Sequence, residues 1–245
     1  MKALILAAGL GTRLKPLTNN IPKALVELNN KTLLQITIDR LISFEITDII
    51  INVHHFADQI IDYLKISNSL GVNISVSDER ELLLDTGGGI KKAAWFFDDG
   101  NPFVVHNVDV ISDLDLRNLY DFHVNSNSLA TLSVKKRHSD RYLLCNAKDE
   151  LCGWKNVKTG EVIISKQDEK ELTEYAYSGI QVVDPKIFNY FPKENVFSVI
   201  GWYLELAKRH KIKICEDTNS FWLDIGKKEN LAEAGKYFKY KNMGE

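Results

Sequence analysis

Cysteine, net charge and long apolar runs are all scarce in this chain of 245 residues. The cysteines Cys145, Cys152 and Cys215 are odd in number and fit no metal-ligand spacing, so we expect reduced thiols. The formal net charge of −2 creates no global field that would attract nucleic acid or an anionic membrane. No apolar run could span a bilayer, and because Met1-Lys2 leads straight into an apolar segment, we expect no signal peptide. These absences predict a cytoplasmic protein that binds neither nucleic acid nor membrane.

Strand-like and helix-like segments alternate through the first two-thirds of the chain. We expect strands at 3–6, 48–54, 73–77, 102–110 and 129–135, and helices at 32–44, 57–65, 90–97 and 116–124. This βαβ order predicts an α/β fold with a doubly wound, mostly parallel (Rossmann-like) sheet. From residue 142 the pattern loosens into short strands and turns, which predicts a smaller mixed β lobe. A strand at 175–183 and helices at 199–210 and 226–238 complete the expected elements.

The most informative stretch follows the first expected strand, where small residues at 7–11 lead into Thr12 and Arg13. Small residues let a ligand approach the backbone closely, and glycines permit a tight turn lined with free N–H groups. Arg13 has a planar fork that suits phosphate oxygens, and Lys23 adds a point charge. The spacing matches neither the P-loop nor the dinucleotide-binding fingerprint. The stretch therefore predicts a site for a nucleoside triphosphate and a second anionic substrate.

Two further segments fall at the carboxyl ends of expected strands, where ligands bind in such sheets. Asp109 ends the strand 102–110, and a carboxylate there can bind Mg²⁺ that also touches triphosphate oxygens. Taken alone, a strand-end aspartate is more often a turn or cap residue. The segment 86–89 (Thr-Gly-Gly-Gly) opens a helix and offers unhindered N–H groups and a positive dipole end. The alternative is a glycine turn needed only for packing.

Residues 6–23 read L-A-A-G-x-G-T-R-L-x-P-L-T-x-x-x-P-K, which resembles the signature of the sugar-1-phosphate nucleotidylyltransferases. The segment 222–226 (W-L-D-I-G) resembles a late motif of the same family. The resemblance covers nearly the whole chain and implies one GT-A-like nucleotidyltransferase domain over 1–245. Its nucleotide-binding half would be 1–136, and its sugar-binding half with a closing helix would be 137–245. It implies an enzyme that uses Mg²⁺ to join a nucleoside triphosphate to a sugar 1-phosphate and releases pyrophosphate.

The resemblance also implies roles for particular residues. The implied catalytic residues are Arg13, Lys23 and Asp109, and the implied Mg²⁺ ligands are Asp109 and Asp224. The implied nucleotide-binding residues are Ala8, Gly9, Gly11, Thr12, Arg13, Glu79, Thr86, Gly87 and Gly88. The implied sugar-phosphate-binding residues are Lys23, Asn107, Ser178, Gly179 and Glu174, with Glu161 as the alternative to Glu174. Two positions depart from the family pattern: Asp85 replaces the more frequent glutamate, and Val108 replaces the usual glycine. For Asp224 the alternative role is to cap the last helix.

The sequence also bears on whether the reaction needs a general base and on which substrates the protein binds. A sugar phosphate is already largely ionised near neutral pH, so it needs no general base, and His54, His55 and His106 are interpreted as structural. Within the family the chain looks most like uridylyltransferases that act on N-acetylmuramic acid 1-phosphate, which predicts UTP and that sugar phosphate as substrates. The neighbouring mannose- or heptose-1-phosphate guanylyltransferases are the alternative. A non-catalytic nucleotide-sugar sensor is a third possibility, although such a protein should have lost a phosphate-binding cation or a metal carboxylate. The oligomeric state is not predicted.

Overall fold

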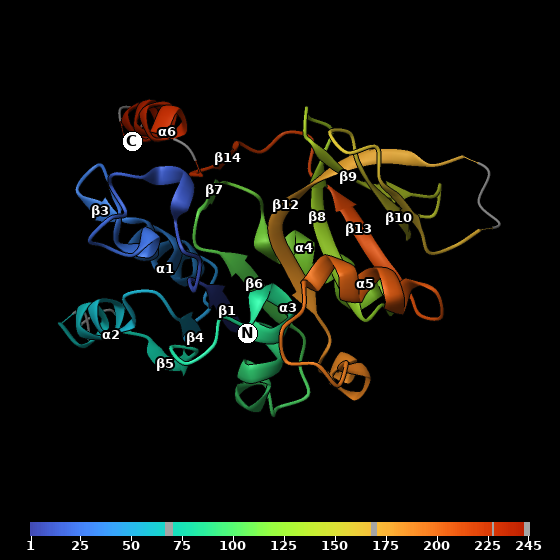
Figure 1. Ribbon diagram of the computed structural model, residues 1–245, viewed down its shortest axis with the longest axis horizontal. Coiled ribbons are helices and arrows are strands. Elements are labelled where there is room, and N and C mark those ends of the chain that lie inside the picture. Colours follow the sequence, from blue (N-terminus) through green and yellow to red (C-terminus); the bar gives the residue numbers. More distant parts are fainter. Residues whose placement is uncertain (67–70, 168–170, 227, 243–245) are drawn as a thin grey trace. The chain divides into compact units, whose positions relative to one another are not determined.

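The computed structural model describes residues 1–66, 71–167, 171–226 and 228–242, and it is an α/β chain of two compact units (Figure 1). The first unit comprises residues 1–83, 106–113 and 221–245, and the second comprises 84–105 and 114–220. The units therefore interleave along the chain, and the division into a nucleotide-binding and a sugar-binding half at residue 136 stays a prediction. The cause of the interleaving is the pairing of β14 (Trp222–Asp224) with β7 (Val110–Ser112), which returns the end of the chain to the first unit. The single nucleotidyltransferase domain stays a prediction.

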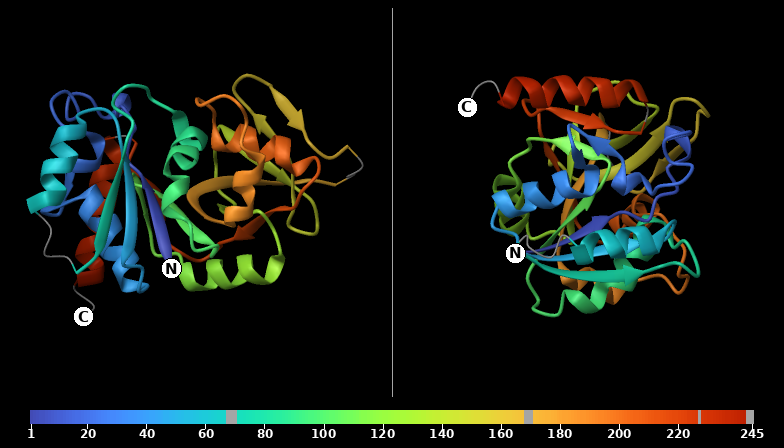
Figure 2. Two further views of the ribbon diagram at one scale, coloured as in Figure 1. Left: turned by 90° about the horizontal axis from the view of Figure 1, so that it is seen from below. Right: turned by 90° about the vertical axis from the view of Figure 1, so that its left-hand side faces the viewer.

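The first unit is built on three parallel strands, β1 (Lys2–Leu6), β4 (Asp48–Val53) and β5 (Asn73–Asp78), which lie side by side in that order (Figure 2). The apolar residues of β1 and β4 do not alternate with polar ones, as expected of strands covered on both faces, whereas those of β5 do alternate. The helices α1 (Leu33–Ser43) and α2 (Ala57–Ile66) connect successive strands. Thr32 caps α1 by accepting a hydrogen bond of 3.0 Å from the Gln35 N–H. The predicted strands and helices of this region are confirmed, with small shifts at their ends.

Shorter elements complete the first unit. They are η1 (Thr12–Leu14), η2 (Lys23–Leu25), β2 (Glu27–Leu28), β3 (Lys31–Thr32) and the C-terminal α6 (Lys228–Asn242). Helix α6 packs on β14 and β2. The rings of Phe221 and Tyr237 stack with centroids 3.8 Å apart, and the Tyr237 hydroxyl donates a hydrogen bond of 2.8 Å to Asp113. These contacts hold α6 beside the strand that carries Asp224.

The second unit combines a mixed sheet with helices. Strand β12 (Thr173–Val183) pairs antiparallel with β8 (Ala130–Lys135) and β9 (Arg141–Cys145), and β10 (Leu151–Asn156) pairs antiparallel with β9 and β11 (Val162–Ile164). Strand β13 (Ile212–Glu216) runs parallel to β8. The remaining elements are α3 (Asp85–Ala93), η3 (Ala94–Phe96), α4 (Leu116–Ser126), η4 (Pro185–Tyr190) and α5 (Val199–Ala207), and β6 (Phe103–Asn107) leads from this unit into the first.

Several elements differ from the expectations. Helix α3 begins at Asp85, five residues before the predicted start at 90, and so contains the glycines that were read as its entry loop. The predicted strand 102–110 is two strands, because Val108 donates its N–H to the Leu6 carbonyl at 3.1 Å and the chain turns before β7. Strand β13 was not predicted; its short apolar pattern carries a weak local signal, and its pairing with β8 depends on the tertiary fold.

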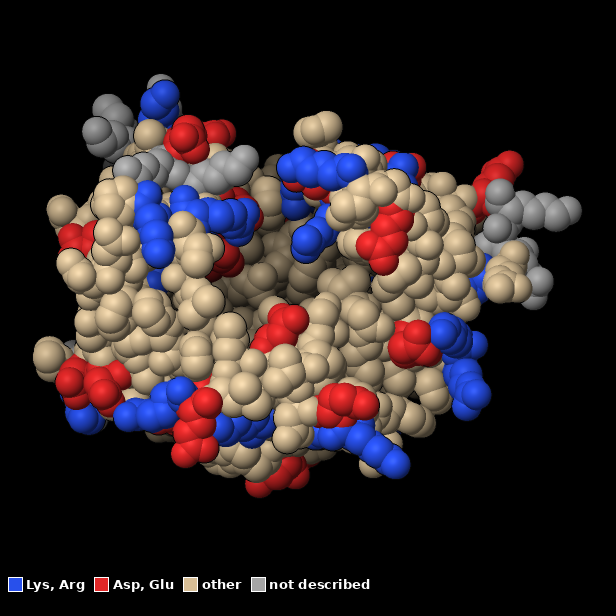
Figure 3. All heavy atoms as spheres, viewed as in Figure 1, with Lys and Arg blue, Asp and Glu red and all other residues tan. Residues whose placement is uncertain are grey.

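The surface carries charges of both signs. In the view of Figure 3, lysine and arginine side chains alternate with aspartate and glutamate side chains. Within the described part of the chain, no helix has the length and apolar character needed to cross a membrane. Among the described residues, Cys145, Cys152 and Cys215 form no disulfide, and burial raises the pKa of Cys215 to about 11. Thiols that stay protonated near neutral pH are poor nucleophiles.

Candidate active site

The loop that follows β1 is held in shape by its own backbone and by neighbouring side chains. Gly11 has a φ of +65°, and a Cβ there would lie 2.9 Å from the Thr18 side chain, so only glycine fits this turn without strain. Thr18 also donates its hydroxyl to the Gly11 carbonyl at 2.8 Å. Leu14 is fully buried and anchors the far end of the loop. In contrast, a Cβ at Gly9 would meet nothing within 4 Å, so the space beside this residue is open.

The start of the loop is joined to the ends of β4 and β5. The Ala7 N–H donates a hydrogen bond of 2.6 Å to the Asn52 side-chain oxygen. The amide nitrogen of Asn52 donates in turn to a Glu79 carboxylate oxygen at 2.8 Å. Glu79 is only 1% exposed, so this predicted nucleotide-binding residue is a buried carboxylate held at the carboxyl end of the sheet. Asn52 falls within the strand expected at 48–54, and its bridging role is not predicted from the sequence.

Lys23 and Asp109 form an ion pair in the same unit. They are separated by 86 positions in the sequence, and they come from η2 and from the turn between β6 and β7. The side chains are 9% and 22% exposed, so water screens the pair only partly. Burial of a charged side chain is unfavourable unless an opposite charge compensates for the lost hydration, and Asp109 supplies that charge for Lys23.

Arg13 and Asp224 form a second, looser pair. The shortest distance between the guanidinium and the carboxylate is 3.8 Å, and the side chains are 60% and 36% exposed. An ion pair this exposed adds little to stability, so Arg13 can exchange the carboxylate for another anion at small cost. The Asp224 carbonyl accepts a hydrogen bond of 2.6 Å from Asn230 of α6, so the expected contact between this residue and the last helix is made through the backbone.

The two aspartates belong to neighbouring chain segments. Asp224 is paired with Val110 across the β7–β14 ladder, and the Ile225 N–H donates to the Asp109 carbonyl at 2.7 Å. Carboxylate oxygens are ligands that suit Mg²⁺, and here two carboxylates come from neighbouring backbone segments. No group of three or more histidine, cysteine, aspartate or glutamate side chains gathers in a metal-binding cluster among the residues that the structure describes. A Mg²⁺ ion on Asp109 and Asp224 would complete its coordination with phosphate and water oxygens, as this ion commonly does.

The segment around Val108 accommodates its departure from the family pattern. Val108 is 4% exposed and does not adopt a positive φ, so the usual glycine is not required for this backbone. Asn107 ends β6 in the first unit, and its carbonyl is hydrogen-bonded to Nδ1 of His106 at 2.9 Å. Burial lowers the pKa of His106 to about 3, so this ring is neutral at physiological pH. His54 is hydrogen-bonded to the Glu79 carbonyl at 2.7 Å.

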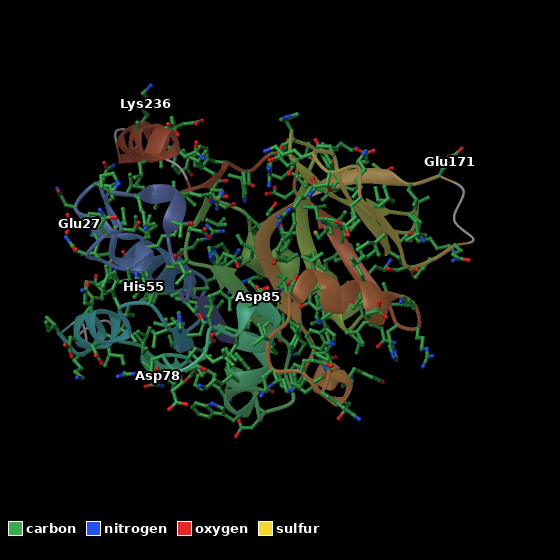
Figure 4. All side chains as sticks on the ribbon, in the orientation of Figure 1. Glu27, His55, Asp78, Asp85, Glu171 and Lys236 are labelled. Carbon is green, nitrogen blue, oxygen red and sulfur yellow. The ribbon has the colours of Figure 1, made fainter. Side chains whose placement is uncertain are left out.

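The segment 84–88 lies in the second unit, where Figure 4 labels Asp85 at the start of α3. The N–H groups of Gly87 and Gly88 both donate to the Phe197 carbonyl, at 3.0 and 3.2 Å. The Thr86 hydroxyl accepts a hydrogen bond of 3.0 Å from the Val199 N–H. The expectation that these glycines offer unhindered N–H groups is therefore wrong, because the loop before α5 already uses them. A role for Thr86, Gly87 and Gly88 in binding the nucleotide stays a prediction.

Gly9 and Gly88 should respond differently to the same substitution. A Cβ at Gly88 would overlap the Asn195 carbonyl, so Gly88→Ala is expected to destabilise the protein by about 1–3 kcal/mol. Gly9→Ala adds a methyl group to open space and should leave the melting temperature unchanged while weakening nucleotide binding at least about tenfold. Thermal unfolding and nucleotide titration of both variants test this, with Gly201→Ala as a helical control. A large loss of stability in Gly9→Ala would contradict the expectation.

The expected sugar-binding residues lie on β12 in the second unit. Gly179 has a φ of +76°, and the pairing of β12 with β8 shifts register between Tyr177 and Gln181, so a bulge forms at Ser178-Gly179. Ser178 is 1% exposed. Glu174 is exposed and forms an ion pair with Lys155 of β10. Their contact with a sugar stays a prediction.

Taken together, a glycine-containing loop after a parallel strand, with cations and carboxylates paired beside it, defines an α/β protein built to bind phosphate groups. The chain belongs to the nucleotidyl transferase family, whose sequence profile matches residues 2–240. The recognition of a sugar-1-phosphate nucleotidylyltransferase from the sequence is confirmed.

Relatives and solved structures agree with this membership. The chain is 33% identical over 234 residues to the N-acetylmuramate alpha-1-phosphate uridylyltransferase of Caulobacter vibrioides, and the match covers 91% of each chain. It is 29% identical over 245 residues to a mannose-1-phosphate guanyltransferase of Yarrowia lipolytica, covering 94% of this chain but 62% of that protein. It resembles the crystal structure of HddC from Yersinia pseudotuberculosis in complex with GMP-PN, with a TM-score of 0.75, 24% identity and coverage of 97% and 99% of the two chains. The expected α/β, GT-A-like fold is confirmed.

Proposed function

We propose that this protein transfers a nucleoside monophosphate from UTP to N-acetylmuramic acid 1-phosphate in the cytoplasm, yielding the UDP-sugar and pyrophosphate. The observation that carries the proposal is the pairing of Lys23 with Asp109 and of Arg13 with Asp224 next to the loop 7–13. The choice of substrates is supported by the similarity to the Caulobacter uridylyltransferase over most of both chains.

In this mechanism an oxygen of the sugar 1-phosphate attacks the α-phosphorus of the triphosphate in line. A bond forms between that oxygen and the α-phosphorus, and the bond from the α-phosphorus to the bridging oxygen breaks. Arg13 holds the β- and γ-phosphates and stabilises the departing pyrophosphate. Lys23 binds the sugar phosphate and brings it to the α-phosphorus. The protein thus works by positioning its substrates and neutralising their charge, as is general in phosphoryl transfer.

The carboxylates of Asp109 and Asp224 would hold the divalent cation. When bound, Mg²⁺ neutralises phosphate charge and orients the reacting groups. The same carboxylates attract Lys23 and Arg13 in the substrate-free protein. When the substrates bind, Lys23 and Arg13 therefore each exchange a carboxylate partner for a phosphate. Before that, the carboxylates keep both side chains close to the site.

No general base is needed, because the attacking phosphate oxygen is already anionic near neutral pH, its second pKa being about 6. The histidines near the strand ends fit this view. His106 is fully buried, and its lowered pKa of about 3 keeps it neutral. His54 is engaged with the Glu79 backbone, and His55, labelled in Figure 4, lies against the Phe56 ring at 4.0 Å between centroids.

Further contacts are proposed for the two substrates. The backbone of the loop, with Ala8, Gly9, Gly11 and Thr12, would pack against the nucleotide, and the open space beside Gly9 supports this. In the first unit, Glu79 would recognise the base. In the second unit, Thr86, Gly87 and Gly88 are also proposed to contact the nucleotide. Asn107, Ser178, Gly179 and Glu174 would contact the sugar phosphate.

The test is pyrophosphate release in the presence of Mg²⁺, with UTP, GTP, CTP and dTTP crossed against four sugar 1-phosphates. The sugars are N-acetylmuramic acid, N-acetylglucosamine, glucose and mannose. A single strong signal with UTP and N-acetylmuramic acid 1-phosphate is expected. A signal with GTP and mannose 1-phosphate would instead assign the guanylyltransferase activity that the Yarrowia relative is named for. No turnover with nucleotide binding intact would overturn the enzymatic proposal and indicate a sensor.

A further inference from the structure

Glu79 directly follows β5, and both its backbone and its side chain are hydrogen-bonded to neighbouring residues. Its N–H donates to the Val53 carbonyl at 2.7 Å, its carbonyl is hydrogen-bonded to Nδ1 of His54 at 2.7 Å, and its carboxylate accepts from Asn52 at 2.8 Å. All three partners lie at the carboxyl end of β4, beside the strand that Glu79 follows. The side chain is 1% exposed, and a buried carboxylate is unfavourable unless hydrogen bonds compensate for lost hydration.

Asn52 is the residue that joins this carboxylate to the loop 7–13. Its oxygen accepts from the Ala7 N–H at 2.6 Å while its nitrogen donates to Glu79, and Asn52 itself is 2% exposed. A primary amide suits this place because it presents an acceptor and a donor at the same time. A carboxylate could accept from Ala7 but could not donate to Glu79, and an aliphatic side chain could do neither.

We propose that Asn52 is a positioning residue for nucleotide binding. Its side-chain amide fixes the position of the Glu79 carboxylate relative to the loop 7–13. The inference rests on the proposed function in that a nucleotide must bind at this loop. Asn52 need not touch the nucleotide. It acts by holding Ala7 and Glu79, so its loss should weaken nucleotide binding and leave the binding of the sugar phosphate largely intact.

The alternative is that Asn52 only closes the strand ends and contributes stability. The positioning role and the purely structural role can be distinguished by substitutions that exchange the hydrogen-bond donor and acceptor between Asn52 and Glu79. Asn52→Asp keeps the acceptor for Ala7 but places a second carboxylate against Glu79 in a buried site. Adding Glu79→Gln to that variant restores the hydrogen bond in reverse, because the glutamine amide can donate to the new aspartate. Glu79→Gln alone keeps the original bond, since its side-chain oxygen still accepts from Asn52.

The experiment measures the affinity for UTP by calorimetry and the KM of each substrate for the full chain and its variants. Asn52→Asp is expected to weaken UTP binding by about tenfold or more and to change the KM of the sugar phosphate by less than about twofold. When Glu79→Gln is already present, Asn52→Asp should weaken UTP binding by less than about threefold relative to Glu79→Gln alone. Asn73→Asp is the matched control, because Asn73 donates to Asp48 at 3.0 Å at the exposed, opposite end of the same two strands.

The outcomes are distinguishable. If the wild-type chain binds none of the four nucleotides, the proposed function fails, and this inference fails with it. If UTP binds and Asn52→Asp lowers only the melting temperature, or weakens UTP binding equally in both Glu79 backgrounds, the inference alone is overturned. Asn52→Ala provides a second variant that adds no charge, and it should also weaken UTP binding about tenfold. An unchanged affinity in that variant would likewise overturn the inference.

Discussion

Asp109→Asn is expected to lower the rate of pyrophosphate release by a factor of about 10³ and also to lower the melting temperature, because it leaves the buried Lys23 without its anion. The substitution preserves the shape of the side chain but removes the negative charge that pairs with Lys23 and that would hold the divalent cation. The affinity for Mn²⁺, measured by electron paramagnetic resonance in the presence of UTP, should fall in parallel. Treatment of the wild-type enzyme with EDTA should abolish turnover, and added Mg²⁺ should restore it.

The control for this prediction is Asp39→Asn, which removes a carboxylate paired with Lys31 at 2.7 Å on the exposed surface of the same unit. That variant should keep wild-type activity, because exposed ion pairs contribute little. Asp224→Asn should resemble Asp109→Asn in its loss of Mn²⁺ affinity. Asp109→Asn with more than a tenth of the wild-type rate and unchanged Mn²⁺ binding would show that Asp109 is not a metal ligand.

Lys23→Met is expected to raise the KM for the sugar phosphate by about two orders of magnitude and the KM for UTP by less than about threefold. Methionine keeps most of the length and apolar volume of the buried lysine stem but cannot bind an anion. The difference between the two substrates follows from the proposed division of labour, in which Lys23 binds the sugar phosphate and Arg13 binds the triphosphate. Steady-state kinetics with each substrate varied in turn provides the measurement.

Lys31→Met is the matched control for Lys23→Met, since Lys31 also pairs with an aspartate but is 60% exposed. Both KM values should stay near those of the wild type. An equal rise of both KM values in Lys23→Met would contradict the prediction, because it would show that Lys23 supports the binding of both substrates. Unfolding of the variant near room temperature would instead identify the pair with Asp109 as a stability element.

Much of the first unit could be predicted from sequence because its signals are local. The apolar strand 3–6, the start of the helix expected at 32–44 and the glycine turn after the first strand each depend on a few neighbouring residues, and the structure places all three as expected. The second unit was harder to predict. Strand β13 is only five residues long, and it is stabilised by pairing with β8, which lies far away in sequence. Such pairing depends on the route of the whole chain.

The glycines of α3 show where local interpretation failed. Consecutive glycines before an expected helix resembled a ligand-binding turn, and their N–H groups were expected to be available. The structure instead packs Gly87 and Gly88 against the segment 195–197, whose Phe197 carbonyl accepts from both. A glycine pattern is the same whether a ligand or another part of the chain approaches the backbone closely.

The sequence by itself determined the family, the α/β class and the residue types of the site, because a strand, a small-residue turn and nearby cations form a contiguous pattern over 6–23. Only the tertiary structure decided the partners: Asp109 for Lys23, Asp224 for Arg13, and the Asn52 amide between Ala7 and Glu79. Each of these contacts joins residues that are distant in sequence. No local propensity encodes such a contact, which forms when the parallel strands and the β7–β14 ladder bring their ends together.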